Sequence, residues 1–136
     1  MPTEIEGLCE TIEDCYEFTL SYAAKGLLTD EGNESGRILR EKLTCAAQAI
    51  RGLEAAAGEV KLTPTEKSKA FIAVLAGDAQ TALAAVELVL AQPVIGSQLI
   101  DNLNASIHLR ALLTDLFLIT EMVALKQSQA KAAVSL

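Results

Sequence analysis

Apolar side chains recur every three or four residues through most of this chain, which is the spacing of helices that bury one face. This pattern predicts one helix over about residues 4–27 and a second over about 35–57, which ends beside Gly58. No useful length of sequence alternates with period two, so strands are not expected.

The clearest local signal for the start of a helix is the sequence Thr-Pro-Thr-Glu at residues 63–66. Thr63 can cap a helix, and Pro64 suits the first turn because its missing N–H has no partner there. The apolar pattern then crosses Gly77 without a change of phase, which predicts one helix over about 64–91.

A last helix is expected over about 97–126, with residues 127–136 as a tail that can fray. Ala and Leu, which lose little rotamer freedom in a helix, dominate the composition. The sequence therefore predicts an all-α chain, an antiparallel four-helix (up-down-up-down) bundle in one domain over 1–136. A break at Gly77 would raise the number of helices to five.

Charge is unevenly distributed along a chain whose net charge is −7. Residues 1–34 hold nine acidic side chains against one basic side chain, Lys25. Four carboxylates form one stripe on the first predicted helix, and we interpret them as a surface that faces a partner: Glu6, Glu10, Glu13 and Glu17. The overall acidity argues against a nucleic-acid partner, which requires a basic surface.

Apolar residues point in nearly every direction between residues 111 and 125. A helix that is apolar all round needs cover on all sides, and four helices leave each one an outward face. We therefore expect a second copy of the chain to provide the cover, in a two-fold homodimer. The candidate interface residues are Leu112, Leu113, Leu116, Phe117, Ile119, Met122 and Val123.

One polar arrangement is a candidate for chemistry: Asp101, Asn104, His108 and Asp115 share one face if residues 97–126 form one helix. A carboxylate near His108 would favour its protonated form, as in a proton-transfer or phospho-accepting histidine. The alternative is a solvated stripe that includes a histidine by chance. The chain resembles histidine phosphotransfer domains in architecture only, because Lys-Gly does not follow His108 as it does in that family.

The sequence lacks the residues that other common catalytic arrangements require, so the chain is not expected to be an enzyme or to hold a cofactor or metal. The sequence contains a single histidine, and no glycine-rich phosphate loop follows a strand. Cys9, Cys15 and Cys45 are expected to be free thiols in a cytoplasmic protein that carries no secretory signal and does not enter a membrane.

The favoured function is a small soluble protein-interaction module, of a regulatory, adaptor or chaperone-like kind, that binds a second copy of itself and another protein. One alternative is a bundle that holds a hydrophobic small molecule between alanine-lined helices. A second alternative is a phosphotransfer-like signalling domain that uses His108.

Overall fold

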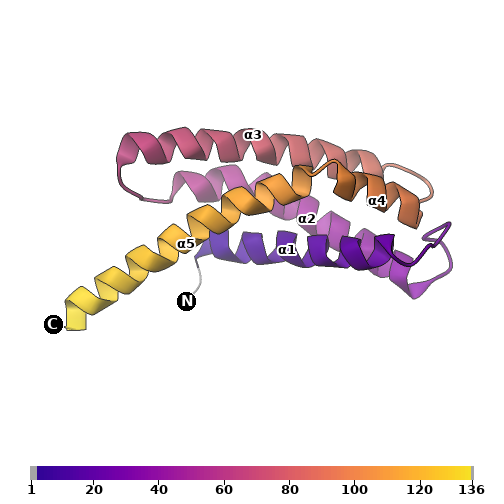
Figure 1. Ribbon diagram of the computed structural model, residues 1–136, viewed down its shortest axis with the longest axis horizontal. Coiled ribbons are helices and arrows are strands. Elements are labelled where there is room, and N and C mark those ends of the chain that lie inside the picture. Colours follow the sequence, from indigo (N-terminus) through magenta and orange to yellow (C-terminus); the bar gives the residue numbers. More distant parts are fainter. Residues whose placement is uncertain (1–2, 136) are drawn as a thin grey trace.

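The computed structural model describes residues 3–135, which form five helices and no strand (Figure 1). This confirms the all-helical prediction. The helices are α1 (Glu4–Ala23), α2 (Glu34–Gly58), α3 (Thr65–Leu90), α4 (Ser97–Ala105) and α5 (His108–Ser135).

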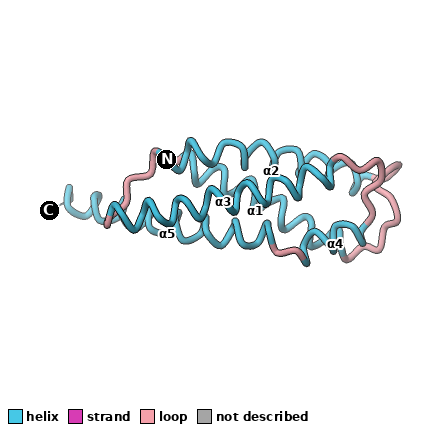
Figure 2. The backbone as a smooth tube through the Cα atoms, turned by 90° about the horizontal axis from the view of Figure 1, so that it is seen from above, coloured by secondary structure: helices cyan, strands magenta, loops and turns pink. Residues whose placement is uncertain are grey.

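Helices α1 and α3 lie between α2 and the pair α4 and α5, and α2 contacts only α1 and α3 among the described helices. Both contact α4 and α5 on one side and α2 on the other, and α2 and α5 lie on opposite sides of the molecule (Figures 1 and 2). The C-terminal half of α5 projects beyond the other helices, and every residue from 124 to 132 is exposed.

The core lies between these helices and consists almost entirely of aliphatic side chains. Each fully buried Leu or Ile contributes roughly 1.5–3 kcal/mol relative to an exposed one. The largest side chains with almost no exposed surface are Tyr22, Ile5, Ile12, Leu39, Leu43, Leu53, Leu75, Ile95, Ile100, Leu109, Leu112 and Leu116.

The first helix ends at Ala23, four residues before the predicted end at 27. Gly26 has a φ of 67°, a left-handed conformation that glycine adopts without a steric penalty. Beyond it, the backbone of Leu27 bonds to Ser97 in both directions: Leu27 N–H donates to Ser97 Oγ at 2.9 Å, and Leu27 C=O accepts from Ser97 N–H at 2.7 Å. These contacts with a distant segment replace the last predicted turn of helix.

The fifth helix arises from a break at residues 106–107, not at Gly77. Helix α3 continues through Gly77 without interruption. Ile107 has a φ of 61°, a costly conformation for a β-branched residue, and its N–H bonds to Asn104 C=O at 3.1 Å as α4 ends. The prediction of one helix over 97–126 is therefore wrong. Helix α5 continues to Ser135, beyond the predicted end of the last helix at about 126.

A buried polar cluster joins the α1–α2 loop to the α3–α4 loop. Asp30 is 7% exposed; its Oδ1 accepts from Ile95 N–H at 2.7 Å, and its Oδ2 accepts from Arg40 Nε. The Arg40 guanidinium also donates to the carbonyls of Gln92 at 3.0 Å and Pro93 at 3.3 Å. We call Asp30, Arg40 and Ile95 the loop clamp.

Two further hydrogen bonds reinforce the same end of the molecule. The buried Tyr22 hydroxyl donates to Ile95 C=O at 2.6 Å, and Ser97 Oγ donates to Tyr22 C=O at 2.7 Å. Because burying a polar group without a partner is costly, these bonds select one arrangement of the two loops.

Helix α3 is the one helix in the described residues that is long and apolar enough to cross a membrane by length and composition. The same composition occurs in helices at the centre of packed proteins. Only 28% of its most apolar 18-residue window is buried, although α3 contacts α2, α4 and α5. Its outward face therefore retains exposed apolar side chains, among them Val74 and Leu88.

Candidate functional site

Most of the predicted interface residues lie in the chain's own core. Leu112, Leu113, Leu116, Ile119 and Val123 are between 0% and 9% exposed, because α1 and α3 cover them. This corrects the expectation that a second copy is needed to shelter them. Phe117 and Met122 remain on the surface, at 44% and 43% exposure.

These two side chains belong to a larger exposed apolar surface on α5. Leu118 is 47% exposed and Leu125 is 53% exposed, and both follow Phe117 within about two turns of helix. We call Phe117, Leu118, Met122 and Leu125 the α5 face. Leu118 and Leu125 were absent from the predicted interface, although the all-round apolar pattern of this segment included both.

A groove of about 290 Å³ runs between α1 and α5, along one edge of the α5 face. Three residues of the predicted acidic stripe line it, whereas Glu17 does not. No Lys or Arg is among the lining residues, which are Glu6, Cys9, Glu10, Glu13, Phe117, Thr120, Glu121 and Ala124. The groove therefore combines four carboxylates with one aromatic ring.

The cysteine in this groove is not poised to act as a nucleophile. Burial, followed by the charges of Glu13 and Glu10, raises the pKa of the Cys9 thiol to about 11. Burial is also the main reason that the pKa of Cys15 rises to about 12. Because the thiolate is the reactive form, both groups are inert near neutral pH, whereas Cys45 is exposed.

The four residues of the predicted polar site do not share one helix face, because the break at Ile107 separates two of them from the others. Asp101 is exposed on α4, and Asn104 Oδ1 accepts from Thr19 Oγ1 at 2.9 Å. His108 is half-buried at the start of α5.

Asp115, the fourth member, points toward Asp78 of α3. It is 8% exposed, and its carboxyl lies within hydrogen-bonding reach of the Asp78 carboxyl. Burial, the hydrogen bond to Asp78 and the Asp78 charge together raise the pKa of Asp115 to about 7. Sequence reasoning missed this pair, because the pattern along each helix does not show which residues face each other across α3 and α5.

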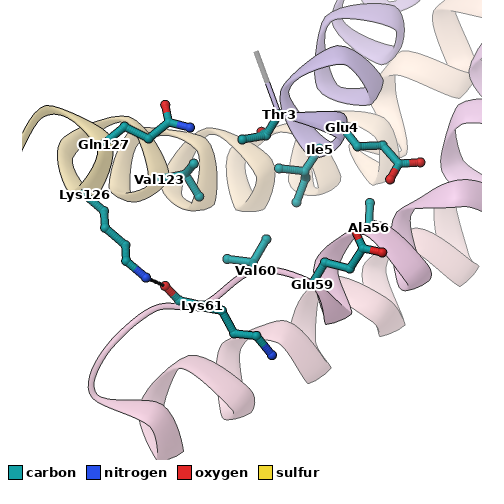
Figure 3. Close-up of a pocket in the computed structure, with 10 residues that line it drawn as sticks. All are labelled: Thr3, Glu4, Ile5, Ala56, Glu59, Val60, Lys61, Val123, Lys126 and Gln127. Atoms are coloured by element: carbon teal, nitrogen blue, oxygen red, sulfur yellow. Dashed lines mark hydrogen bonds between the residues drawn. The ribbon is translucent and has the colours of Figure 1, made fainter. Parts of the chain in front are cut away.

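A second hollow, of about 300 Å³, lies where the first turn of α1, the end of α2 and α5 meet (Figure 3). Ile5, Ala56, Val60 and Val123 provide its apolar surface. Polar side chains surround them, and Lys126 Nζ donates to the Lys61 carbonyl across one side. This volume is at the lower end of the range for small-molecule sites.

Within residues 3–135, no group of three or more His, Cys, Asp or Glu side chains is placed to hold a metal ion. An apolar helix face, an acidic groove beside it and a small apolar hollow are among the surface features of the described residues. Comparison with protein-family models, with curated proteins and with solved structures finds no match to this chain.

Proposed function

We propose that this protein is a helical interaction module that self-associates as a homodimer through the α5 face. The supporting observation is that four large apolar side chains remain roughly half exposed on one helix after the chain has packed its own core. An exposed apolar patch on a chain of this size is typical of a binding surface.

The expected affinity follows from the exposed area. Burying the remaining half of each side chain on the α5 face contributes roughly 1 kcal/mol, or about 8 kcal/mol for two faces. Association itself costs at least about 4 kcal/mol in lost freedom of motion. The net gain is therefore at most about 4 kcal/mol, so we expect a weak, concentration-dependent dimer with a Kd of about 1 mM or weaker.

The acidic groove suggests which other protein the module would bind. Its carboxylates complement Lys or Arg side chains, and Phe117 offers a contact for an adjacent apolar anchor. A basic amphipathic helix has both features. In this proposal α4 and α5 together take the place of the fourth helix in an up-down-up-down bundle. The proposed location is the cytoplasm, whose reducing conditions keep cysteines such as these three as free thiols.

Sedimentation equilibrium at chain concentrations up to about 1 mM tests the homodimer, because the expected Kd is of that order. Leu118→Asp places a charge on the α5 face and should give a monomer at every concentration, with an unchanged helical circular dichroism spectrum. Leu28→Asp is the matched control, because Leu28 is 92% exposed in the α1–α2 loop. A wild-type chain that stays monomeric, or a Leu118→Asp variant that dimerises like the control, would contradict the proposal.

A hydrophobic small molecule in the hollow of Figure 3 is the second candidate function, favoured by the apolar surface that four helix and loop residues provide there. Val60→Asp would place a charge in this hollow without touching the α5 face. If the hollow binds such ligands, the wild type should enhance the fluorescence of an apolar naphthalene dye and the variant should not. Equal enhancement by both would assign the dye to another surface.

A further inference from the structure

Asp78 and Asp115 face each other where α3 and α5 run in opposite directions (Figure 1). Asp115 is 92% buried, and no hydrogen-bond donor in the described part of the chain reaches its Oδ2 atom. Asp78 is only partly buried. When both groups are ionised, each presents only acceptors to the other, so the buried oxygen has no partner.

The hydroxyl groups nearest to the pair in sequence are already engaged. Thr81 Oγ1 donates to Gly77 C=O at 3.1 Å, and Thr114 Oγ1 donates to Arg110 C=O at 2.9 Å. Neither threonine hydroxyl is therefore available to satisfy the orphaned oxygen.

Charged groups on the surrounding helices do not neutralise the pair either. Asp78 is the charged group of α3 that faces Asp115, and the carboxylates of α1 line the groove beside Phe117. Asp101 of α4 is exposed. On α5 itself, Arg110 is exposed five residues away, and His108 lies seven residues away, about 10 Å along the helix axis.

We propose that Asp78 and Asp115 form a proton-binding site, in which one shared proton joins α3 to α5 at neutral pH. A protonated carboxyl donates to the ionised carboxyl opposite, so a single proton satisfies the buried oxygen and removes the repulsion between two adjacent charges. The site suits a proton, because Oδ2 has almost no solvent-accessible surface through which a hydrated metal ion could approach.

Release of this proton would weaken the contact between α3 and α5. The raised pKa of Asp115 puts that release close to neutral pH, so modest alkalinisation would loosen α5, the helix that carries the exposed apolar face. The evidence for the proton site is the buried, unpartnered Asp115 oxygen opposite Asp78, which does not depend on the proposed dimer.

The sign of the pH dependence follows from proton binding. Between about pH 4 and pH 7 the folded chain holds a proton that the unfolded chain has released, so raising the pH favours unfolding. A difference of one proton increases the unfolding constant about tenfold per pH unit in this range.

Urea unfolding from about pH 5 to pH 9 tests the site in four chains: the wild type, Asp115→Asn, Asp78→Asn and His108→Gln. The wild type should lose stability as the pH rises to about 7. Asp115→Asn should lose this dependence, because the amide that replaces the buried carboxyl has no titrating proton. Asp78→Asn should reduce it, because the Asp78 charge is gone but the burial that contributes most to the raised pKa of Asp115 remains. His108→Gln should keep it, since it removes the one histidine but leaves the pair intact.

Carbon-13 NMR of the aspartate carboxyl groups in the wild type provides a test that does not depend on the variants folding. One carboxyl signal should titrate near pH 7. The proposal is overturned if every aspartate titrates below about pH 5. It is equally overturned if His108→Gln abolishes the pH dependence, or if Asp115→Asn retains it.

Discussion

Replacing Asp30 by alanine should destabilise the fold more than removing any surface carboxylate. Asp30 is the centre of the loop clamp: one oxygen accepts from the buried Ile95 N–H at 2.7 Å, and the other accepts from Arg40. The Asp30 side chain is only 5% exposed, whereas Arg40 retains 34%. After the substitution, water can therefore solvate the Arg40 charge and replace part of the lost interaction. The Ile95 N–H, in contrast, loses its only described hydrogen-bond acceptor.

The expected cost combines these two losses. A buried N–H left without an acceptor costs roughly 1–3 kcal/mol, and a charge-assisted bond to a partly exposed arginine adds about 1–2 kcal/mol. We expect Asp30→Ala to lower the free energy of unfolding by about 4 kcal/mol, within the range for breaking a buried ion pair. Asp30→Asn, whose amide oxygen can still accept from Ile95, should cost about half as much.

Urea denaturation followed by circular dichroism measures both variants, with Asp14→Ala as the control. Asp14 pairs with Lys42 at 2.5 Å, but its side chain is 62% exposed, so its loss should cost less than about 1 kcal/mol. The reasoning is refuted if Asp30→Ala costs no more than Asp14→Ala. It is also refuted if Asp30→Asn proves as damaging as Asp30→Ala, because the Ile95 bond would then contribute nothing.

Three further predictions concern single groups. Gly36→Ala should prevent stable folding, measured by loss of the unfolding transition, because a Cβ there would lie 2.0 Å from the Asp30 carbonyl oxygen. A thiol-reactive chromogenic disulfide at neutral pH should label Cys45 rapidly and leave Cys9 and Cys15 unlabelled until urea is added, because these two are buried with raised pKa values. Hydrogen bonding to Arg40 lowers the pKa of Asp30, so the wild type should lose stability in urea titrations below about pH 4, and Asp30→Ala should lack that contribution.

The helical structure of the chain was predictable from the sequence, because the spacing of apolar residues along the chain is a local property. Apolar residues such as Ile12 and Leu39 recur with the period of a helix, and both proved to be fully buried. The continuity of α3 through Gly77 was predictable for the same reason, since the apolar phase did not change there.

The break at Ile107 could not be read in this way. Its positive φ is unfavourable for isoleucine, so no local preference indicates it. The early end of α1 likewise depends on hydrogen bonds to Ser97, a residue 70 positions away from Leu27. Both features result from tertiary contacts that override local propensity.

The candidate site was predictable only in part. The acidic stripe followed from helical spacing, and three of its members do line the groove beside Phe117. The pairing of Asp78 with Asp115 and the position of Asp30 in the loop clamp each require knowledge of which helices or loops are neighbours. Spacing along one helix carries no such information.

The loop clamp also makes the two ends of the molecule unequal. At one end, buried bonds tie both loops together; at the other, the α2–α3 loop is joined to α5 by an exposed bond from Lys126 to the Lys61 carbonyl. Amide hydrogens near Ile95 should therefore exchange with solvent far more slowly than those near Lys61. Local unfolding on heating would therefore begin at the end near Lys61 and reach the loop clamp last.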